Sequence, residues 1–95
     1  MKTLLIKRKI QKTLRFTQDI KKLSSSIQKE AFTVAQQLAE NVFNPQLNIK
    51  HMTGLKGIYR VVVMTEYRMI FYFDTKTLYL LRISHRKEIY RKLEL

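Results

Sequence analysis

The residues that most often interrupt helices and strands, glycine and proline, occur only between positions 45 and 57. Pro45, Gly54 and Gly57 are the only such residues in a chain of 95. Proline cannot donate a backbone hydrogen bond and restricts the residue before it, whereas glycine is favoured where the backbone turns. The segment 44–57 is therefore predicted to divide the chain into a helical half and a strand-rich half.

The first half shows the periodicity of helices. Residues 3–8 are predicted to form a short strand, and apolar side chains then recur at three- and four-residue steps. The serines at 24–26 interrupt this pattern and offer an N-cap for a second helix, which Asn44 and Pro45 would end. The first stripe consists of Ile10, Thr13, Leu14, Phe16, Thr17, Ile20 and Leu23, and the second of Ile27, Ala31, Val34, Ala35, Leu38 and Val42.

The second half is rich in Val, Ile, Tyr and Phe. Residues 58–64, 67–73 and 78–84 are predicted to form three strands of an antiparallel meander, because their links at 65–66 and 74–77 are short and polar. The tail 85–95 is predicted to form one or two helical turns. The fold class is therefore α+β, with the order βααβββ(α), in which a two-helix hairpin packs on a meander sheet. The length indicates a single domain, 1–95.

The chain is strongly basic, with 19 Lys and Arg against 7 Asp and Glu and a formal charge of +12. Such an imbalance favours a polyanionic partner, because neutralised phosphates release counterions. An acidic membrane surface, an acidic protein or a merely solvated surface are the alternatives. We expect no membrane partner, because no apolar run approaches the roughly 18 residues of a membrane span and the N-terminus lacks the apolar core of a signal peptide.

Several chemistries find no support in the sequence. Cysteine is absent, which excludes disulfides and thiolate sites and suits a cytoplasmic protein in a reducing compartment. His51 and His85 are the only histidines, and neither has carboxylates at ligand spacing, so no metal site is expected. There is also no glycine-rich loop for a phosphate, and we expect no cofactor, small-molecule or otherwise.

Strand alternation gathers arginines on one sheet face. Arg60, Arg68 and Arg82 are predicted to share the face that does not meet the helices, with Arg86 and Tyr90 directly after the last strand. Arginine binds phosphate through a planar fork of donors, and tyrosine stacks on bases. His85 is a candidate for acid–base chemistry or for a structural hydrogen bond. Each arginine alone is as well explained by a solvated side chain. Further candidate RNA contacts are Lys50, Lys56, Arg82, Lys87 and Arg91.

Three sequence blocks resemble the RelE/ParE toxin superfamily. They are G-L-K-G-I-Y-R-V at 54–61, E-Y-R-M-I-F-Y at 66–72 and I-S-H-R-K-E-I-Y at 83–90, in the order and spacing of that superfamily. With the preceding helical hairpin, the resemblance spans nearly the whole chain. It implies a microbial-ribonuclease-like fold and an acidic antitoxin as partner.

The RelE-like branch implies a specific activity. Its members cut mRNA on the ribosome without metal, using the RNA 2′-OH as nucleophile. By this resemblance Arg60, Arg68 and Arg86 would bind and stabilise the phosphate, Tyr90 would orient the base, and His85 would stand at an acid–base position. Two features depart from the RelE enzymes: Val62 replaces a lysine, and the terminal block is two residues shorter. A ParE-like inhibitor of DNA gyrase and an inactive RNA-binding relative remain alternatives.

Overall fold

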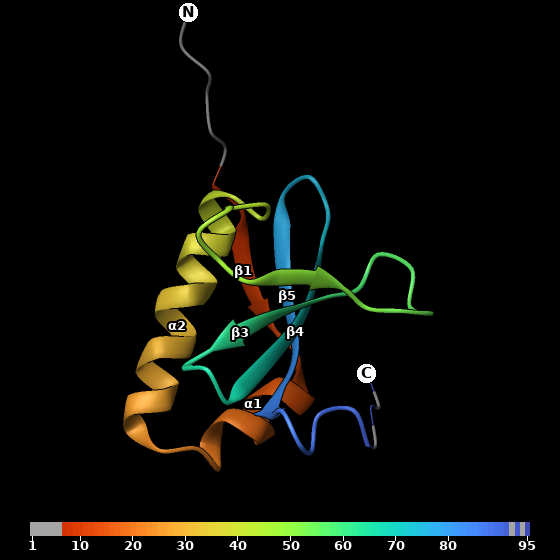
Figure 1. Cartoon of the computed structure of the whole chain (residues 1–95). Helices are drawn as coiled ribbons and strands as arrows, with labels where there is room; N and C mark the ends of the chain where they lie inside the picture. Colours follow the sequence, from red (N-terminus) through yellow and green to blue (C-terminus); the bar gives the residue numbers. More distant parts are fainter. Residues whose placement is uncertain (1–6, 92, 94) are drawn as a thin grey trace, which may run out of the picture.

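The computed structural model describes residues 7–91, 93 and 95 of the chain. These residues form two helices and a five-stranded mixed sheet (Figure 1). The predicted α+β class is confirmed. The elements are β1 (Lys9–Lys12), α1 (Leu14–Lys21), α2 (Ser25–Glu40), β2 (Ile49–His51), β3 (Tyr59–Val63), β4 (Tyr67–Phe73) and β5 (Thr77–His85).

The sheet has the strand order β1-β5-β4-β3-β2. The three strands β3, β4 and β5 form the predicted antiparallel meander. The first strand joins the far side of β5 in parallel, with Lys9 opposite Thr77. The edge strand β2 lies within the segment that the sequence indicated only as a break, and it pairs antiparallel with β3.

The helices begin where the sequence offers hydroxyl caps. Thr13 Oγ1 accepts a hydrogen bond from the backbone N–H of Phe16, and Ser24 Oγ accepts one from Ile27. The predicted serine cap is therefore confirmed. The first helix starts later than its apolar stripe indicated, because Ile10 belongs to β1 and packs from a strand.

Two other boundaries differ from the prediction. The second helix ends at Glu40, before Asn44 and Pro45, and Val42 is buried from the loop that follows. The strand predicted at 3–8 was wrong for Lys7 and Arg8, which precede β1, and its remaining residues lie outside the described part of the chain. The tail 86–91 forms hydrogen-bonded turns rather than a regular helix.

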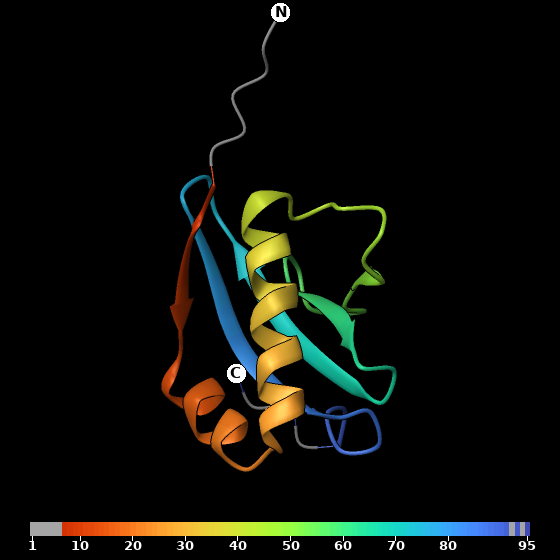
Figure 2. The same ribbon diagram turned by 90° about the vertical axis from the view of Figure 1, so that its left-hand side faces the viewer.

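The main core lies between the helices and one face of the sheet. Figure 2 shows α2 running across this face, with α1 near one end of β5. Apolar burial on both layers stabilises this arrangement, at roughly 25 cal/mol per Å² removed from water. The largest fully buried side chains of this core are Phe16, Leu38, Val61, Val63, Met69, Phe71, Leu78, Leu80 and Ile83.

A β-bulge changes which side chains of β5 face the helices. The β4–β5 register skips one residue, so that Ile70 lies opposite Arg82 whereas Phe71 lies opposite Leu80. Ile83 therefore joins the helix-facing core with Leu80, although simple alternation predicted that it would share a face with Leu81. A bulge is a local irregularity that the apolar pattern does not reveal.

The opposite face of the sheet is partly covered as well. A second apolar cluster there consists of Met52, Ile70, Leu81 and Ile89. Its cover comes from the glycine-containing loop and the C-terminal turns, which lie on the side of the sheet away from α2 (Figure 1). The C-terminal segment is thus fixed against this second face.

Candidate nucleic-acid interface

A cavity of about 350 Å³ opens on the second face of the sheet, beside its β2 edge. Lys50 of β2, Arg60 of β3 and Tyr90 of the C-terminal turns line it together with the residues 51–53. Ile89 anchors the tail in the second apolar cluster and is only 4% exposed, whereas the neighbouring Tyr90 remains 50% exposed. Two cationic groups and an accessible aromatic ring therefore meet in one concave surface.

The sheet register extends this surface toward β4. Lys50 lies opposite Arg60, and Val62 lies opposite Arg68. Arg60 and Arg68 are therefore diagonal neighbours on one face, about 7–8 Å apart in the backbone. Their predicted common face is confirmed. Arg60 also donates a long hydrogen bond of 3.5 Å from Nη1 to Asn48 Oδ1.

The guanidinium of Arg68 is held by the β3–β4 turn. Its Nη1 donates to the backbone oxygens of Thr65 at 2.7 Å and Tyr67 at 3.0 Å. Met64 and Thr65 both have positive φ, 46° and 63°, and this conformation is strained for side chains other than glycine, above all for a β-branched one. The turn carbonyl that holds Arg68 thus belongs to the most strained part of the hairpin.

Arg86 is tied to the same hairpin. Its backbone N–H donates to Glu66 O at 2.8 Å, which continues the β4–β5 pairing one step beyond Tyr67 and His85. Its Nε donates to Glu66 Oε2 at 2.9 Å. The three arginines predicted to act together therefore lie along neighbouring strands, each held by a different acceptor. Glu66 was not predicted as a site residue, although it begins the sequence block 66–72 and directly precedes Tyr67 and Arg68.

His85 lies on the other side of the sheet. It is paired with Tyr67, whose ring it contacts edge-on at 5.5 Å, and it lines a separate cavity of about 370 Å³ with Asp19 and Arg82. Its Nδ1 accepts a hydrogen bond from the backbone N–H of Lys87 at 3.1 Å. A neutral His85 therefore carries its proton on Nε2, which points toward Glu66 at 3.6 Å. The structure does not bring His85 into the cavity of Arg60 and Tyr90.

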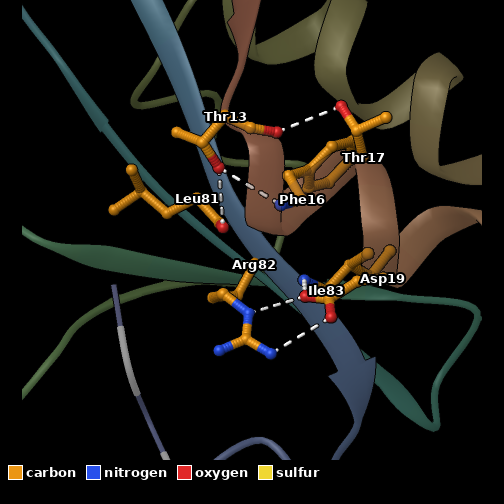
Figure 3. A network of polar contacts seen from close by, with 7 residues as sticks. All are labelled: Thr13, Phe16, Thr17, Asp19, Leu81, Arg82 and Ile83. Atoms are coloured by element: carbon orange, nitrogen blue, oxygen red, sulfur yellow. Dashed lines mark hydrogen bonds and ion pairs between the residues drawn. The ribbon is translucent and has the colours of Figure 1, made fainter.

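Arg82 forms an ion pair within the protein. Its Nε and Nη2 donate to the two carboxylate oxygens of Asp19 at 2.7 and 3.1 Å, and the N–H of Ile83 donates to the same carboxylate at 3.1 Å (Figure 3). Both side chains are largely buried, with 20% and 12% exposure. This geometry favours a structural role for Arg82, which joins α1 to β5, over the RNA contact predicted from the sequence.

The other predicted RNA contacts are exposed basic residues around the site. Lys56 lies in the turn between the two glycines, and Lys87 and Arg91 lie on the C-terminal turns. Across the described ranges no group of three His, Cys, Asp or Glu side chains is placed to hold a metal ion, and no helix there is long and apolar enough to cross a membrane.

Comparison with solved structures reveals the same fold in bacterial and archaeal toxins. A RelB–RelE antitoxin–toxin complex from Methanococcus jannaschii contains a chain with 28% identity and a TM-score of 0.70, over 83% of this chain and 93% of that one. The toxin–antitoxin complex RelBE2 of Mycobacterium tuberculosis matches with a TM-score of 0.73 at 19% identity, over 90% and 98%. The YoeB dimer of Staphylococcus aureus matches with a TM-score of 0.68 at 14% identity, over 84% of this chain and 98% of that one.

A family model gives the more specific assignment. The model of the ParE-like toxin domain matches residues 25–91, from the start of α2 to the C-terminal turns. The chain therefore belongs to the ParE-like toxin family, within the RelE/ParE superfamily. A search of curated proteins finds no match.

Proposed function

We propose that this protein is the toxin of a type II toxin–antitoxin pair and cleaves mRNA on the ribosome without a metal ion. The observation that carries this proposal is the cavity in which Lys50, Arg60 and Tyr90 meet. The complexes of RelE-like toxins with their antitoxins support an antitoxin as a further partner, and the net charge of +12 favours an acidic one. A basic face of this kind suits an acidic antitoxin or an RNA backbone equally. Because both partners would occupy the same surface, binding of one would exclude the other.

The proposed reaction is an internal phosphoryl transfer. The 2′-hydroxyl of the RNA loses its proton and its oxygen attacks the adjacent phosphorus, the bond to the 5′-oxygen breaks, and that oxygen takes up a proton, so that a 2′,3′-cyclic phosphate and a free 5′-hydroxyl remain. Negative charge that develops on the phosphoryl oxygens is stabilised by fixed cations. Arg60 supplies such a cation within the cavity, and Arg68 lies diagonally beside it on the same sheet face. We assign Arg86, which directly follows β5, to the same row of cations.

Tyr90 would hold the target nucleotide. A tyrosine that is half exposed can offer its ring to a stacking base, and stacking contributes about 1–3 kcal/mol per base. Tyr90 lines the cationic cavity, and its hydroxyl group can donate to a phosphate bound there. His85 is not assigned to the proton transfers, since it lines the other cavity and its Nδ1 accepts a hydrogen bond from the backbone N–H of Lys87.

A second candidate function is inhibition of DNA gyrase, as in the ParE-like branch. Two observations favour it: Val62 places an apolar side chain opposite Arg68, and the guanidinium of Arg68 is engaged by the turn carbonyls. Val62 adds no positive charge to this face, and the guanidinium of Arg68 is already bound. The face therefore offers fewer cations to an RNA phosphate. In this case the same surface would bind protein without performing chemistry.

Mapping of mRNA ends after addition of the protein to translating ribosomes distinguishes the two functions. We expect codon-phased cuts that end in cyclic phosphates. Arg60→Ala should reduce the rate by about 100-fold, in the range found when one charge-stabilising donor is removed. Lys29→Ala, on the exposed side of α2, is the matched control and should cleave normally. Intact mRNA together with trapped gyrase–DNA complexes would refute the nuclease proposal.

A further inference from the structure

Glu66 connects the strained hairpin turn to the C-terminal segment by two independent contacts. Its backbone oxygen accepts from the N–H of Arg86, and its carboxylate oxygen Oε2 accepts from the Nε of the same residue. The first contact fixes the backbone of Arg86, and the second fixes the direction of its guanidinium. Glu66 itself follows Thr65, whose positive φ sets where β4 begins.

A carboxylate at this position is unexpected on electrostatic grounds. The chain carries a net charge of +12, and Glu66 lies beside the two arginines that extend the proposed phosphate-binding row. A negative charge there weakens the attraction for a polyanion. Both Glu66 and Arg86 are about half exposed, at 47% and 51%, so their ion pair contributes little to folding stability. Neither RNA affinity nor the stability of this ion pair therefore accounts for the carboxylate, whose Oε2 also lies 3.6 Å from Nε2 of His85.

We propose that Glu66 is a positioning residue for Arg86. This inference rests on the proposed function. A guanidinium held through Nε keeps its four Nη hydrogens for a phosphate, and the carboxylate restricts the long side chain to one direction. Glu66 would thus weaken RNA attraction slightly while it orients Arg86 toward the scissile phosphate. Such a residue acts through another side chain and does not touch the reacting atoms.

The kinetic test separates orientation from attraction. In the ribosome-dependent cleavage assay, Glu66→Ala should lower kcat by about threefold to tenfold, the range that a partly exposed charged hydrogen bond supports. KM should stay constant or fall, because a negative charge has left the basic face. Glu66→Gln, which still accepts from Nε, should restore most of kcat. Glu30→Ala removes the same charge from an exposed position on α2 and is the matched control.

A double-mutant cycle supplies the decisive comparison. In an Arg86→Ala background, Glu66→Ala should cause no further loss of kcat, because the side chain that it orients is gone. Additive losses, or a fall in KM without a change in kcat, would overturn the proposal. Thermal unfolding of each variant is measured alongside, and a midpoint for Glu66→Ala more than a few degrees below wild type would assign the residue to folding instead.

A spectroscopic readout makes the test independent of the activity. In ¹⁵N-resolved NMR spectra, the Nε–H of Arg86 should give a sharp signal that exchanges slowly with water, and Glu66→Ala should abolish it. If the protein does not cleave mRNA but this signal behaves as expected, the positioning contact stands and the proposed reaction fails. If the Nε–H of Arg86 exchanges equally fast with water in the wild type and in Glu66→Ala, the positioning proposal fails whatever the activity.

Discussion

The ion pair between Asp19 and Arg82 yields the most quantitative prediction. Asp19→Ala removes a carboxylate that accepts three hydrogen bonds, two from the guanidinium and one from the N–H of Ile83. Breaking a fully buried pair costs about 3–5 kcal/mol. Because these side chains keep 12% and 20% exposure, water recovers part of that cost, and we expect a loss of about 2–3 kcal/mol.

Chemical denaturation measures this loss directly. Urea unfolding followed by far-ultraviolet circular dichroism should show a lower midpoint with an unchanged slope, and thermal unfolding should shift by roughly 10–20 °C for a domain of this size. The double variant Asp19→Ala/Arg82→Ala should be less destabilised than the sum of the two single variants, since both single variants remove the same contact between the two side chains. A loss below about 0.5 kcal/mol for Asp19→Ala, within the range of ordinary surface substitutions, would refute the structural role of this pair.

Three further perturbations concern the turns. Thr65→Gly should raise the free energy of unfolding by about 0.5–1 kcal/mol, because glycine relieves the positive φ at some cost in chain entropy; a lower urea midpoint would contradict this. Gly57→Ala should lower it by about 1 kcal/mol through backbone strain alone, since nothing lies within 4 Å of the added carbon; an unchanged midpoint would argue against the positive φ of 75°. The N–H groups of Lys76 and Thr77 hold the pKa of Asp74 below its usual 3.8. Its contribution to stability is therefore present above about pH 4 and is lost as the pH falls through the lowered pKa, so the stability difference between wild type and Asp74→Asn should shrink on acidification; a difference that is constant from pH 6 to 3 would refute this.

The sequence was sufficient for the elements whose periodicity is long. The 16-residue α2 repeats its apolar positions over several turns, and β3, β4 and β5 alternate with short polar links, so their approximate positions could be predicted. The short strands were not predictable. The strand β1 has four residues, and Ile10 fits a helical stripe as well as a strand, while β2 has three residues within a segment rich in turn formers. Only pairing with a neighbouring strand stabilises such short segments.

The site was predictable only in part for a related reason. Alternation places Arg60 and Arg68 on one face correctly, because β3 and β4 pair without irregularity. Whether an arginine is available to a ligand depends on long-range acceptors that alternation does not reveal. Asp19, for example, meets Arg82 across 63 residues of sequence. The placement of Tyr90 similarly depends on the burial of Ile89, which only the folded second face provides.

The parallel pairing of β1 with β5 also has a consequence for synthesis. The hydroxyl of Thr13 donates to the backbone oxygen of Leu81 across 68 residues, and Lys9 pairs with Thr77. Contacts this distant in sequence form late, because the two ends of a long intervening segment must first be brought together. The first strand emerges early but has no partner until β5 has been translated. The complete sheet, and with it the C-terminal turns that carry Tyr90, can therefore assemble only when nearly the whole chain has left its own ribosome.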